Sequence, residues 1–535
     1  MRAYFKFFLF LILLSLFLLI DSLFISNESQ IPRQDESLGQ QTKFIVDKPV
    51  FYEDESSNIN LDPNWEVSIS EYPELNDILI SIDDPTGLME LQNNPTESSF
   101  SVIDTIEELG VMRLRVNDPI RFAETLSDIE GTFKLERNVR LSKPALPEAR
   151  ILEAEVPFSF NSMTWLGVSE DRQSRGQGVK VAILDTGIDI SHPSLDGLAI
   201  RQVSLLQSNS NRALGHGTGI ASIIAGQSSS LLGLAPSSEI LSVQVLDENG
   251  QGDAFTIAKG ILMAVDEGSQ VINLSLGGMT SSPVLDHAIQ VANSKGVILV
   301  SAVGNDGAPK IAYPARHKDV VAVSSVDAKS RVSTFSNYGE EVDIAAPGVG
   351  VITAWGDDEY VNFSGTSIAA AFVTGTIASE ISRSQSYTPT GLLSSLYENA
   401  DETEKPGFDQ WSGNGVLNIR RLEQRDTPGI VDAAIVGYYF DSKNLSSSGT
   451  KPFSVTVQNQ GTSWIQSMEL KIKYKGLEKI FMIGNLAKGE IQSEKLYFDA
   501  GNSQGELAIY SEVTLNNQKD QNPENNKRTS VLVLP

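Results

Sequence analysis

The stretch NFSGTSIAAAFVTGTIASE, residues 362–380, guides the interpretation of the whole chain. Ser367 follows Gly365-Thr366 and opens an almost wholly apolar run of small residues, which suits a helix packed tightly inside a core. A hydroxyl in the first turn of such a helix lies beside unpaired N–H groups and the positive end of the helix dipole. Ser367 is therefore a candidate nucleophile whose attack would generate an oxyanion. A helix-capping serine is the competing interpretation of this stretch.

Apolar runs and helix-like stretches alternate over roughly 250 residues around this segment. The apolar runs, typical of strands buried on both faces, lie at 179–185, 240–246, 271–276, 297–303, 320–326 and 342–345. Helix-like stretches include 254–266 and 283–294. This pattern predicts an α/β domain with a parallel sheet covered by helices on both faces. Its functional site is expected at the carboxyl ends of the strands.

Three further polar residues lie at these strand ends and helix starts. Asp185 stands in Asp-Thr-Gly after the first run, His216 in Gly-His-Gly-Thr-Gly, and Asn305 in Gly-Asn-Asp-Gly. A serine hydroxyl needs a base to become a nucleophile, and a histidine base needs a carboxylate to hold its tautomer. An Asn side chain can donate a hydrogen bond to the resulting oxyanion.

Each of these residues has a plainer interpretation when taken alone. Asp185 and Asn305 could be turn residues, and His216 could be a loop histidine without a partner. Asp-Thr-Gly also occurs at the active aspartate of aspartic proteases, which requires a second such triplet or a small symmetric dimer. The combination in the order Asp, His, Ser, at the expected strand and helix ends, favours a catalytic triad.

Five blocks resemble the subtilisin-like serine proteases, the subtilases, over about 160–425. They are AILDTGID at 182–189, GHGTGIAS at 215–222, NLSLGG at 273–278, VGNDG at 303–307 and SGTSIAAAFVTG at 364–375. The resemblance implies a serine endopeptidase that works through an acyl-enzyme, with Asp185, His216 and Ser367 as the triad. It assigns Asn305 and the Ser367 N–H as oxyanion donors.

The same resemblance implies how a polypeptide substrate is held. Ser275, Leu276 and Gly277 would line the S1 pocket, and Gly250 to Gly252 would form an edge that pairs with an extended substrate. Tyr313-Pro314 resembles the family's cis-proline near the base of that pocket.

The sequence also departs from the family pattern. Ala371 and Phe372 replace the usual proline and histidine after the nucleophile, and Ile368 stands where many relatives have methionine. Ser194 replaces an aspartate that helps to bind calcium, and the loop that wraps that ion is missing. We therefore do not predict that calcium site, and we assign no metal ligand and no cofactor.

The flanking segments suggest export and two further domains. Residues 1–25 read as a signal peptide or a membrane anchor, and 26–75 as a polar linker with one strand at 44–50. Residues 76–150 read as a small α+β unit resembling a subtilase propeptide. It has strands at 78–82, 111–116 and 133–141 and helices at 100–109 and 119–129. This unit would act as an intramolecular inhibitor and be cut off near 144–160.

The last segment, 429–535, reads as an antiparallel β-sandwich that resembles the Ig-like CARDB domains of bacterial adhesion proteins. Seven short strands are expected, at 430–440, 453–459, 468–474, 479–483, 495–498, 508–515 and 529–534. Such a domain would attach the protein to a substrate or a membrane or cell surface, or serve as a spacer. It supplies the alternative function, a catalytically silent subtilase scaffold used for binding.

Composition excludes several other classes of function. The 535 residues carry a formal net charge of -27, which argues against nucleic-acid binding. The absence of cysteine excludes disulfides and thiol catalysis. We expect a location outside the cell or in the cell envelope.

Overall fold

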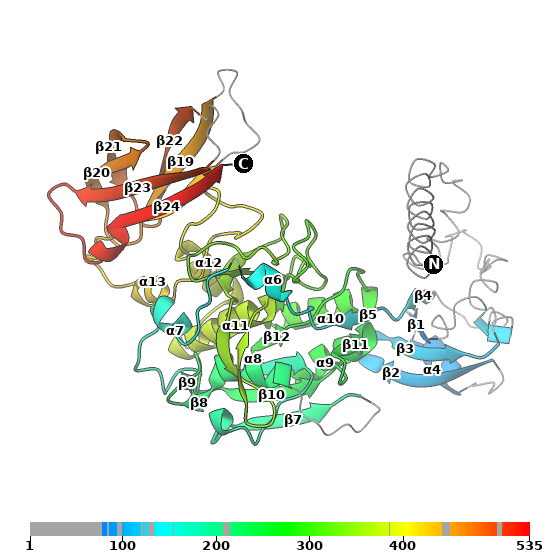
Figure 1. The fold of residues 1–535 in the computed structure, drawn as a ribbon. Coiled ribbons are helices and arrows are strands. Elements are labelled where there is room, and N and C mark those ends of the chain that lie inside the picture. The colour runs from blue at the N-terminus through cyan, green and yellow to red at the C-terminus, as the bar shows by residue number, and fades with distance from the viewer. Residues whose placement is uncertain are drawn as a thin grey trace, which may run out of the picture. The chain divides into compact units, whose positions relative to one another are not determined.

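The protein was analysed as a computed structural model (Figure 1). It describes residues 77–82, 85–93, 99–118, 121–122, 125–126, 133–153, 155–206, 215–384, 386–440, 450–499 and 505–534. The chain divides into two compact units, 1–138 and 139–535. The expected signal or anchor, the linker and the strand at 44–50 lie outside the described residues, as does most of the helix expected at 119–129. No helix among the described residues is both long enough and apolar enough to cross a membrane.

The described part of the first unit is a four-stranded antiparallel sheet in the order β2-β3-β1-β4. Its elements are β1 (Asp77–Ile82), α4 (Pro85–Asn93), β2 (Phe100–Ile106), the 3-10 turn η2 (Glu107–Leu109), β3 (Val111–Val116) and β4 (Phe133–Arg137). Its core includes Ile80, Met112 and the edge-to-face pair of Phe100 and Phe122. The strands predicted at 78–82 and 111–116 are confirmed.

Two predictions for this region are wrong. Residues 100–109 form strand β2 and a short 3-10 turn rather than a helix. A register shift between Val102 and Asp104 interrupts the two-residue alternation, so the apolar spacing imitates that of a helix. The single strand expected at 133–141 is two strands, because β4 pairs with β1 whereas β5 (Arg140–Ser142) pairs with β11 (Gln251–Asp253) in the second unit.

A seven-stranded parallel sheet forms the centre of the second unit, in the order β15-β14-β13-β12-β6-β10-β7 (Figure 1). The strands are β6 (Lys180–Asp185), β7 (Ile200–Ser204), β10 (Glu239–Gln244), β12 (Val271–Leu274), β13 (Ile298–Ala302), β14 (Val320–Val326) and β15 (Ile344–Pro347). Six of them are the predicted apolar runs, and their side chains are almost all buried. The predicted α/β class is therefore confirmed.

Two pairs of helices cover this sheet. α8 (Gly215–Ala225) packs on α11 (Thr366–Arg383), and α9 (Ala254–Asp266) packs on α10 (Pro283–Ser294). α11 crosses β12, β13, β14 and β15, and all of its residues from Thr366 to Ile381 are buried. Its Ala- and Gly-rich sequence explains this burial, because small side chains let a helix approach its neighbours closely.

Smaller elements complete the α/β domain. They are α6 (Ala149–Leu152), α7 (Ser162–Trp165), η3 (Pro193–Leu195), β8 (Gln227–Ser228), β9 (Leu231–Leu232), β16 (Val351–Ala354), β17 (Tyr360–Phe363), α12 (Pro389–Glu398) and α13 (Ile419–Gln424).

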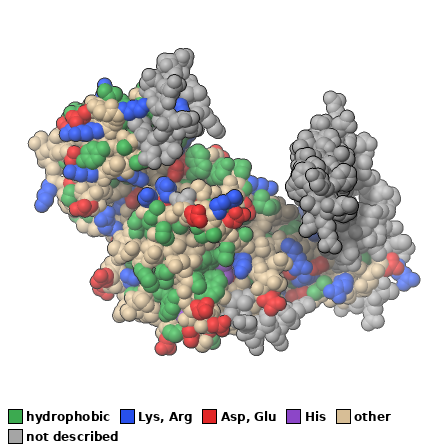
Figure 2. Space-filling model, viewed as in Figure 1, with side chains coloured by type: hydrophobic (Ala, Val, Ile, Leu, Met, Phe, Trp, Pro, Cys, Tyr) green, Lys and Arg blue, Asp and Glu red, His purple; other side chains and the backbone are tan. Residues whose placement is uncertain are grey.

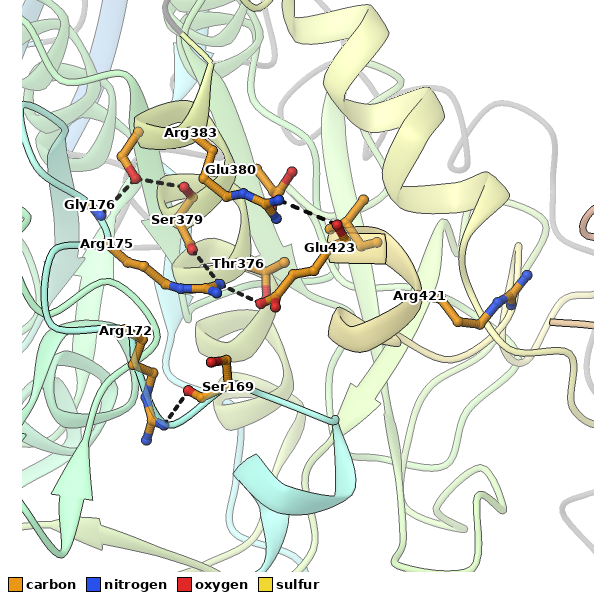
Figure 3. A network of polar contacts seen from close by, with 12 residues as sticks. Ser169, Arg172, Arg175, Gly176, Thr376, Ser379, Glu380, Arg383, Arg421 and Glu423 are labelled. Carbon is orange, nitrogen blue, oxygen red and sulfur yellow. Dashed lines mark hydrogen bonds and ion pairs between the residues drawn. The ribbon is translucent and has the colours of Figure 1, made fainter. Parts of the chain in front are cut away.

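A polar network attaches the start of this domain to α11 and α13 (Figure 3). The Arg175 guanidinium donates to the Glu423 carboxylate and to Ser379 Oγ, the latter at 3.3 Å. The Gly176 N–H donates to Ser382 Oγ at 2.9 Å. Chain segments about 200 residues apart in sequence are thereby held together around the C-terminal half of α11.

The C-terminal region consists of two antiparallel sheets, β18-β19-β22 and β21-β20-β23-β24. Their strands are β18 (Ala433–Phe440), β19 (Thr450–Asn459), β20 (Ile465–Tyr474), β21 (Leu477–Leu486), β22 (Ile491–Asp499), β23 (Gly505–Leu515) and β24 (Lys527–Leu534), with the 3-10 turn η4 (Pro523–Asn526) before the last. A separate apolar cluster between the sheets makes this a β-sandwich, as predicted. Acidic and basic side chains are interspersed on the face of the described residues seen in Figure 2.

Candidate active site

Asp185 and His216 are in direct contact. Asp185 ends β6 at the carboxyl edge of the sheet, and His216 is the second residue of α8. His216 Nδ1 lies 2.8 Å from Asp185 Oδ1 and 2.9 Å from Oδ2, and both side chains are almost fully buried. A carboxylate at Nδ1 keeps the proton on that nitrogen, so Nε2 presents its lone pair. Nε2 has no hydrogen-bond partner among the described residues, which leaves it available as a base.

Small neighbours make this contact possible. A Cβ on Gly217 would lie 2.2 Å from the Gly187 carbonyl oxygen, so only glycine lets α8 approach the turn after Asp185 so closely. Thr186 donates to Asp185 Oδ1 from its backbone nitrogen at 2.7 Å. The Phe363 ring packs edge-on against the His216 ring with centroids 5.4 Å apart. These contacts fix the direction of the imidazole.

Ser367 is the second residue of α11 and is 1% exposed. No hydrogen bond joins its hydroxyl to His216 Nε2 in this structure. Its carbonyl accepts a hydrogen bond from Ser275 Oγ at 3.2 Å, which connects the first turn of α11 to the end of β12. Helices α8 and α11 pack on each other, so the two residues occupy the first turns of neighbouring helices.

Asn305 follows β13 and has both polar ends of its amide engaged. Its Oδ1 accepts from the Thr366 backbone nitrogen at 2.9 Å and from Thr366 Oγ1 at 2.8 Å. Its Nδ2 donates to the Ala145 carbonyl at 2.8 Å. Gly365 has φ +153°, and a Cβ there would lie 3.0 Å from Asn305 Nδ2, so glycine keeps this approach open.

The expected substrate-binding residues lie on two backbone edges that pair with the same stretch of the chain. Gly252 lies in β11 and pairs with Leu141, and the Gly250 carbonyl accepts from the Lys143 backbone nitrogen at 2.9 Å. Gly277 exchanges two backbone hydrogen bonds with Ser142, at 2.9 and 2.7 Å. A segment of the chain itself thus lies extended between the two edges.

Ser275 and Leu276, the other residues expected to line the S1 pocket, follow β12 and are buried. Ser275 accepts from Asn273 Nδ2 at 2.9 Å, and Leu276 is fully buried. The Tyr313-Pro314 peptide bond is cis, as the resemblance implied. No group of three or more His, Cys, Asp or Glu side chains is placed to hold a metal ion within the described part of the chain.

Sequence reasoning missed three contributors to this site. Thr186 and Thr366 adjoin Asp185 and Ser367 inside the quoted blocks, so their proximity was visible but their hydrogen bonds were not. Nothing in the sequence signalled that Ala145 lies against Asn305, because this contact joins positions 160 residues apart.

Comparison with known proteins finds similarity to a family of peptidases. The Peptidase S8 family model, which describes the subtilase family, matches residues 176–415. A thermostable alkaline protease of Halalkalibacterium halodurans is 35% identical over 339 residues, covering 62% of this chain and 90% of that protein. Thermitase of Thermoactinomyces vulgaris is 36% identical over 239 residues, covering 44% of this chain and 85% of that protein. A solved mutant of the protease domain of PatA is 29% identical and covers 48% of this chain and 99% of that chain, with a TM-score of 0.44.

Proposed function

The chain belongs to the subtilase family of serine proteases, and on that premise we propose that it hydrolyses peptide bonds through Asp185, His216 and Ser367. The observation that carries this proposal is the buried His216 ring, held by Asp185 at Nδ1 and unpartnered at Nε2. This arrangement would provide a general base on α8, which packs against α11, the helix that carries Ser367 as its second residue.

In the proposed mechanism, Ser367 Oγ attacks the substrate carbonyl while His216 Nε2 takes its proton. Asp185 stabilises the imidazolium that forms. Asn305 Nδ2 and the Ser367 backbone N–H donate to the developing oxyanion. His216 then returns the proton to the leaving amine, and a water molecule hydrolyses the acyl-enzyme by the same route.

The two backbone edges support recognition of extended polypeptides. Backbone groups at Gly250, Gly252 and Gly277 engage an extended segment through main-chain hydrogen bonds, which depend little on its side chains. The substrate class we propose is therefore unfolded or flexible polypeptide. Ser275 and Leu276 are proposed to line the pocket for the residue before the scissile bond.

The protein is further proposed to be an exported zymogen that processes itself. The basic and apolar start of the sequence supports export, with the segment either removed or retained as an anchor. The small α+β unit before residue 139 is proposed to be the inhibitory propeptide, and the sandwich after residue 429 to attach the enzyme to a surface, in the manner of CARDB domains.

Purified full-length protein and its Ser367→Ala variant, incubated with an unfolded protein substrate, test the enzymatic proposal. Hydrolysis by the wild type alone is expected, together with maturation to a smaller species that the variant does not undergo. Equal maturation of both proteins would contradict self-processing. No hydrolysis by a folded wild type, even after its N-terminal unit is removed by an added protease, would favour the silent scaffold instead.

A further inference from the structure

Residues 140–145 run through the candidate active site in an extended conformation. Strand β5 pairs antiparallel with β11, which places Leu141 opposite Gly252. On its other edge, Ser142 exchanges backbone hydrogen bonds with Gly277. The segment is thus the middle strand of a three-stranded arrangement, held from both sides in the manner of a bound peptide.

The burial of Leu141 and the end of the backbone pairing define the register of this segment against the two backbone edges. Leu141 is 1% exposed and lies next to Gly278, where a Cβ would come within 3.0 Å of the Arg140 carbonyl oxygen. Pro144 has no N–H to donate, so the backbone pairing ends at Lys143, which donates to the Gly250 carbonyl. The chain is therefore free to turn its next carbonyls toward α11.

After Pro144, the carbonyl of Ala145 contacts a candidate catalytic residue. Asn305 Nδ2 donates to the Ala145 carbonyl oxygen at 2.8 Å, within the range required of an oxyanion donor. Thr366 holds the opposite end of that amide, so the direction of the donor is fixed. One carbonyl of the chain is in this way presented to the proposed oxyanion donor.

We propose that Ala145–Leu146 is the bond cut during maturation, an inference that rests on the enzymatic function proposed above. Ser367 Oγ would bond to the Ala145 carbonyl carbon, with its proton passing to His216. The bond from that carbon to the Leu146 nitrogen would break, and His216 would return the proton to that nitrogen, freeing an amine. Water would then hydrolyse the ester, leaving a carboxylate on Ala145 and restoring the Ser367 hydroxyl.

The chain after this bond is arranged so that the new end can leave. Leu146 is 64% exposed, and residues 148–150 are exposed as well. The chain is next fixed to the α/β domain at Glu155, whose carboxylate accepts from Thr334, and at Val156, whose nitrogen donates to Asp327 at 3.2 Å. Cleavage would thus produce a short free arm, while residues 140–143 stay paired with both backbone edges as a product that blocks them.

The test is to express the full chain and measure the masses of both products at the earliest time at which cleavage is detected. We expect an N-terminal fragment that ends at Ala145 and a mature chain that begins at Leu146. A first fragment that ends at any other residue, for example at Pro144 or Leu146, would overturn the assignment. Early sampling separates the first cut from later trimming of the exposed arm.

A pair of variants tests whether the burial of Leu141 determines that the Ala145–Leu146 bond is cut. Leu141→Asp would place a charge at a fully buried position and should slow the first cut at least about tenfold. Leu141→Ala should slow it less, which covers the case in which the aspartate variant does not fold. Leu152→Asp, a matched change at a partly exposed position of the same connecting segment, should leave the rate unchanged. Equal rates for Leu141→Asp and wild type would contradict the proposal.

A fluorophosphonate probe distinguishes failure of this inference from failure of the proposed function. Labelling at Ser367 combined with cleavage at another bond, or with no cleavage, would overturn the Ala145–Leu146 assignment and leave the peptidase proposal standing. Absence of both labelling and cleavage in folded protein, including protein whose first unit an added protease has removed, would overturn both.

Discussion

The Asn305 amide is held at its oxygen by one neighbour while its nitrogen bonds to another part of the chain. Thr366 donates two hydrogen bonds to Asn305 Oδ1, and Asn305 Nδ2 donates to the Ala145 carbonyl. The sequence led us to propose Asn305 as an oxyanion donor, but it did not show that Thr366 holds the amide oxygen. An isolated Gly-Asn-Asp-Gly is typical of a turn, and only the fold brings it beside α11.

We expect Asn305→Ala to lower kcat by about 10²–10³, the loss observed for removal of such a donor from a subtilisin, with little change in KM. Asn305→Asp keeps an oxygen for Thr366 but removes the donor, so it should be at least as impaired. Asn293→Ala, an exposed change on α10, is the control. Steady-state kinetics on a peptide substrate measure the effect, and a rise in KM at constant kcat would contradict an oxyanion role.

The helices and strands of the α/β domain were largely predictable because their apolar patterns are strong. α9 and α10 match their predicted bounds, and six of the parallel strands differ from theirs by a few residues at most, whereas β7 was not predicted. The structure of residues 100–109 was not predictable in the same way, because the bulge after Val102 alters the apolar spacing. The strand is recognisable only from its pairing with β3. The sequence of segment 140–145 has too little apolar alternation to predict a strand. Its structure depends on pairing with edges more than 100 residues away.

The close approach of α8 to the turn after β6 gives a prediction about helix placement. Gly217→Ala would bring a Cβ within 2.2 Å of the Gly187 carbonyl oxygen, so α8 has to shift and carry His216 away from Asp185. We expect a loss of kcat of about two orders of magnitude or more, comparable to the loss of a positioned general base. Peptide hydrolysis measures it, with thermal unfolding followed in parallel.

Gly219→Ala on the same helix is the matched control. Its Cβ would lie 3.2 Å from Thr353 Oγ1, a contact that a small shift relieves, so activity should stay within a few-fold of wild type. Equal loss of activity in both variants would show that the helix tolerates no added methyl group, and would remove the specific argument for the α8 contact.

The network around α11 in Figure 3 gives a stability prediction for the same element. Arg175→Met would leave the Glu423 carboxylate, 15% exposed, without its cationic partner. We expect the free energy of unfolding to fall by about 2 kcal/mol, less than for a fully buried pair. Arg150→Met removes a similar pair with Glu148 whose side chains are 85% and 69% exposed, and should cost under about 0.5 kcal/mol. Denaturant unfolding compares the two, and equal losses would contradict the proposed tie.

At the scale of the whole second unit, acidic residues lie buried where the sandwich meets the α/β domain. The Glu402 backbone nitrogen donates to Gln458 of β19 at 3.2 Å, and Gln460 donates to Asp401 at 2.9 Å. Arg528 of β24 donates to the Lys329 carbonyl at 3.3 Å. Burial raises the pKa of Glu402 to about 7, with a smaller contribution from Asp409, against the hydrogen bond donated by Gly407.

This shift predicts that stability depends on pH. Because the Glu402 pKa is higher in the folded state, the folded protein holds its proton more tightly, and stability is lost as pH rises from about 4.5 to about 7. The contribution is no more than about 3 kcal/mol. Burial also raises the pKa of Asp343 to about 6 and that of Glu404 and Asp409, so their effects have the same sign.

Glu402→Gln keeps an oxygen for the Gly407 N–H and cannot ionise, so it should stabilise the protein at pH 8 and flatten its decline between pH 4.5 and 7. Glu398→Gln, at an exposed position on α12, should leave the profile unchanged. Thermal unfolding at a series of pH values makes the comparison. A Glu402→Gln variant with the slope of the wild type would show that this carboxyl does not titrate as its burial requires.

The account as a whole depends on Ser367 being activated by His216, and labelling with a fluorophosphonate measures that activation directly. We predict a single labelled site at Ser367 in the mature protein, about 10³-fold slower labelling or none in His216→Ala, and unchanged labelling in Ser379→Ala on the same helix. Labelling of another serine, or labelling of Ser367 at the same rate in His216→Ala, would contradict the claim that these residues form a catalytic unit.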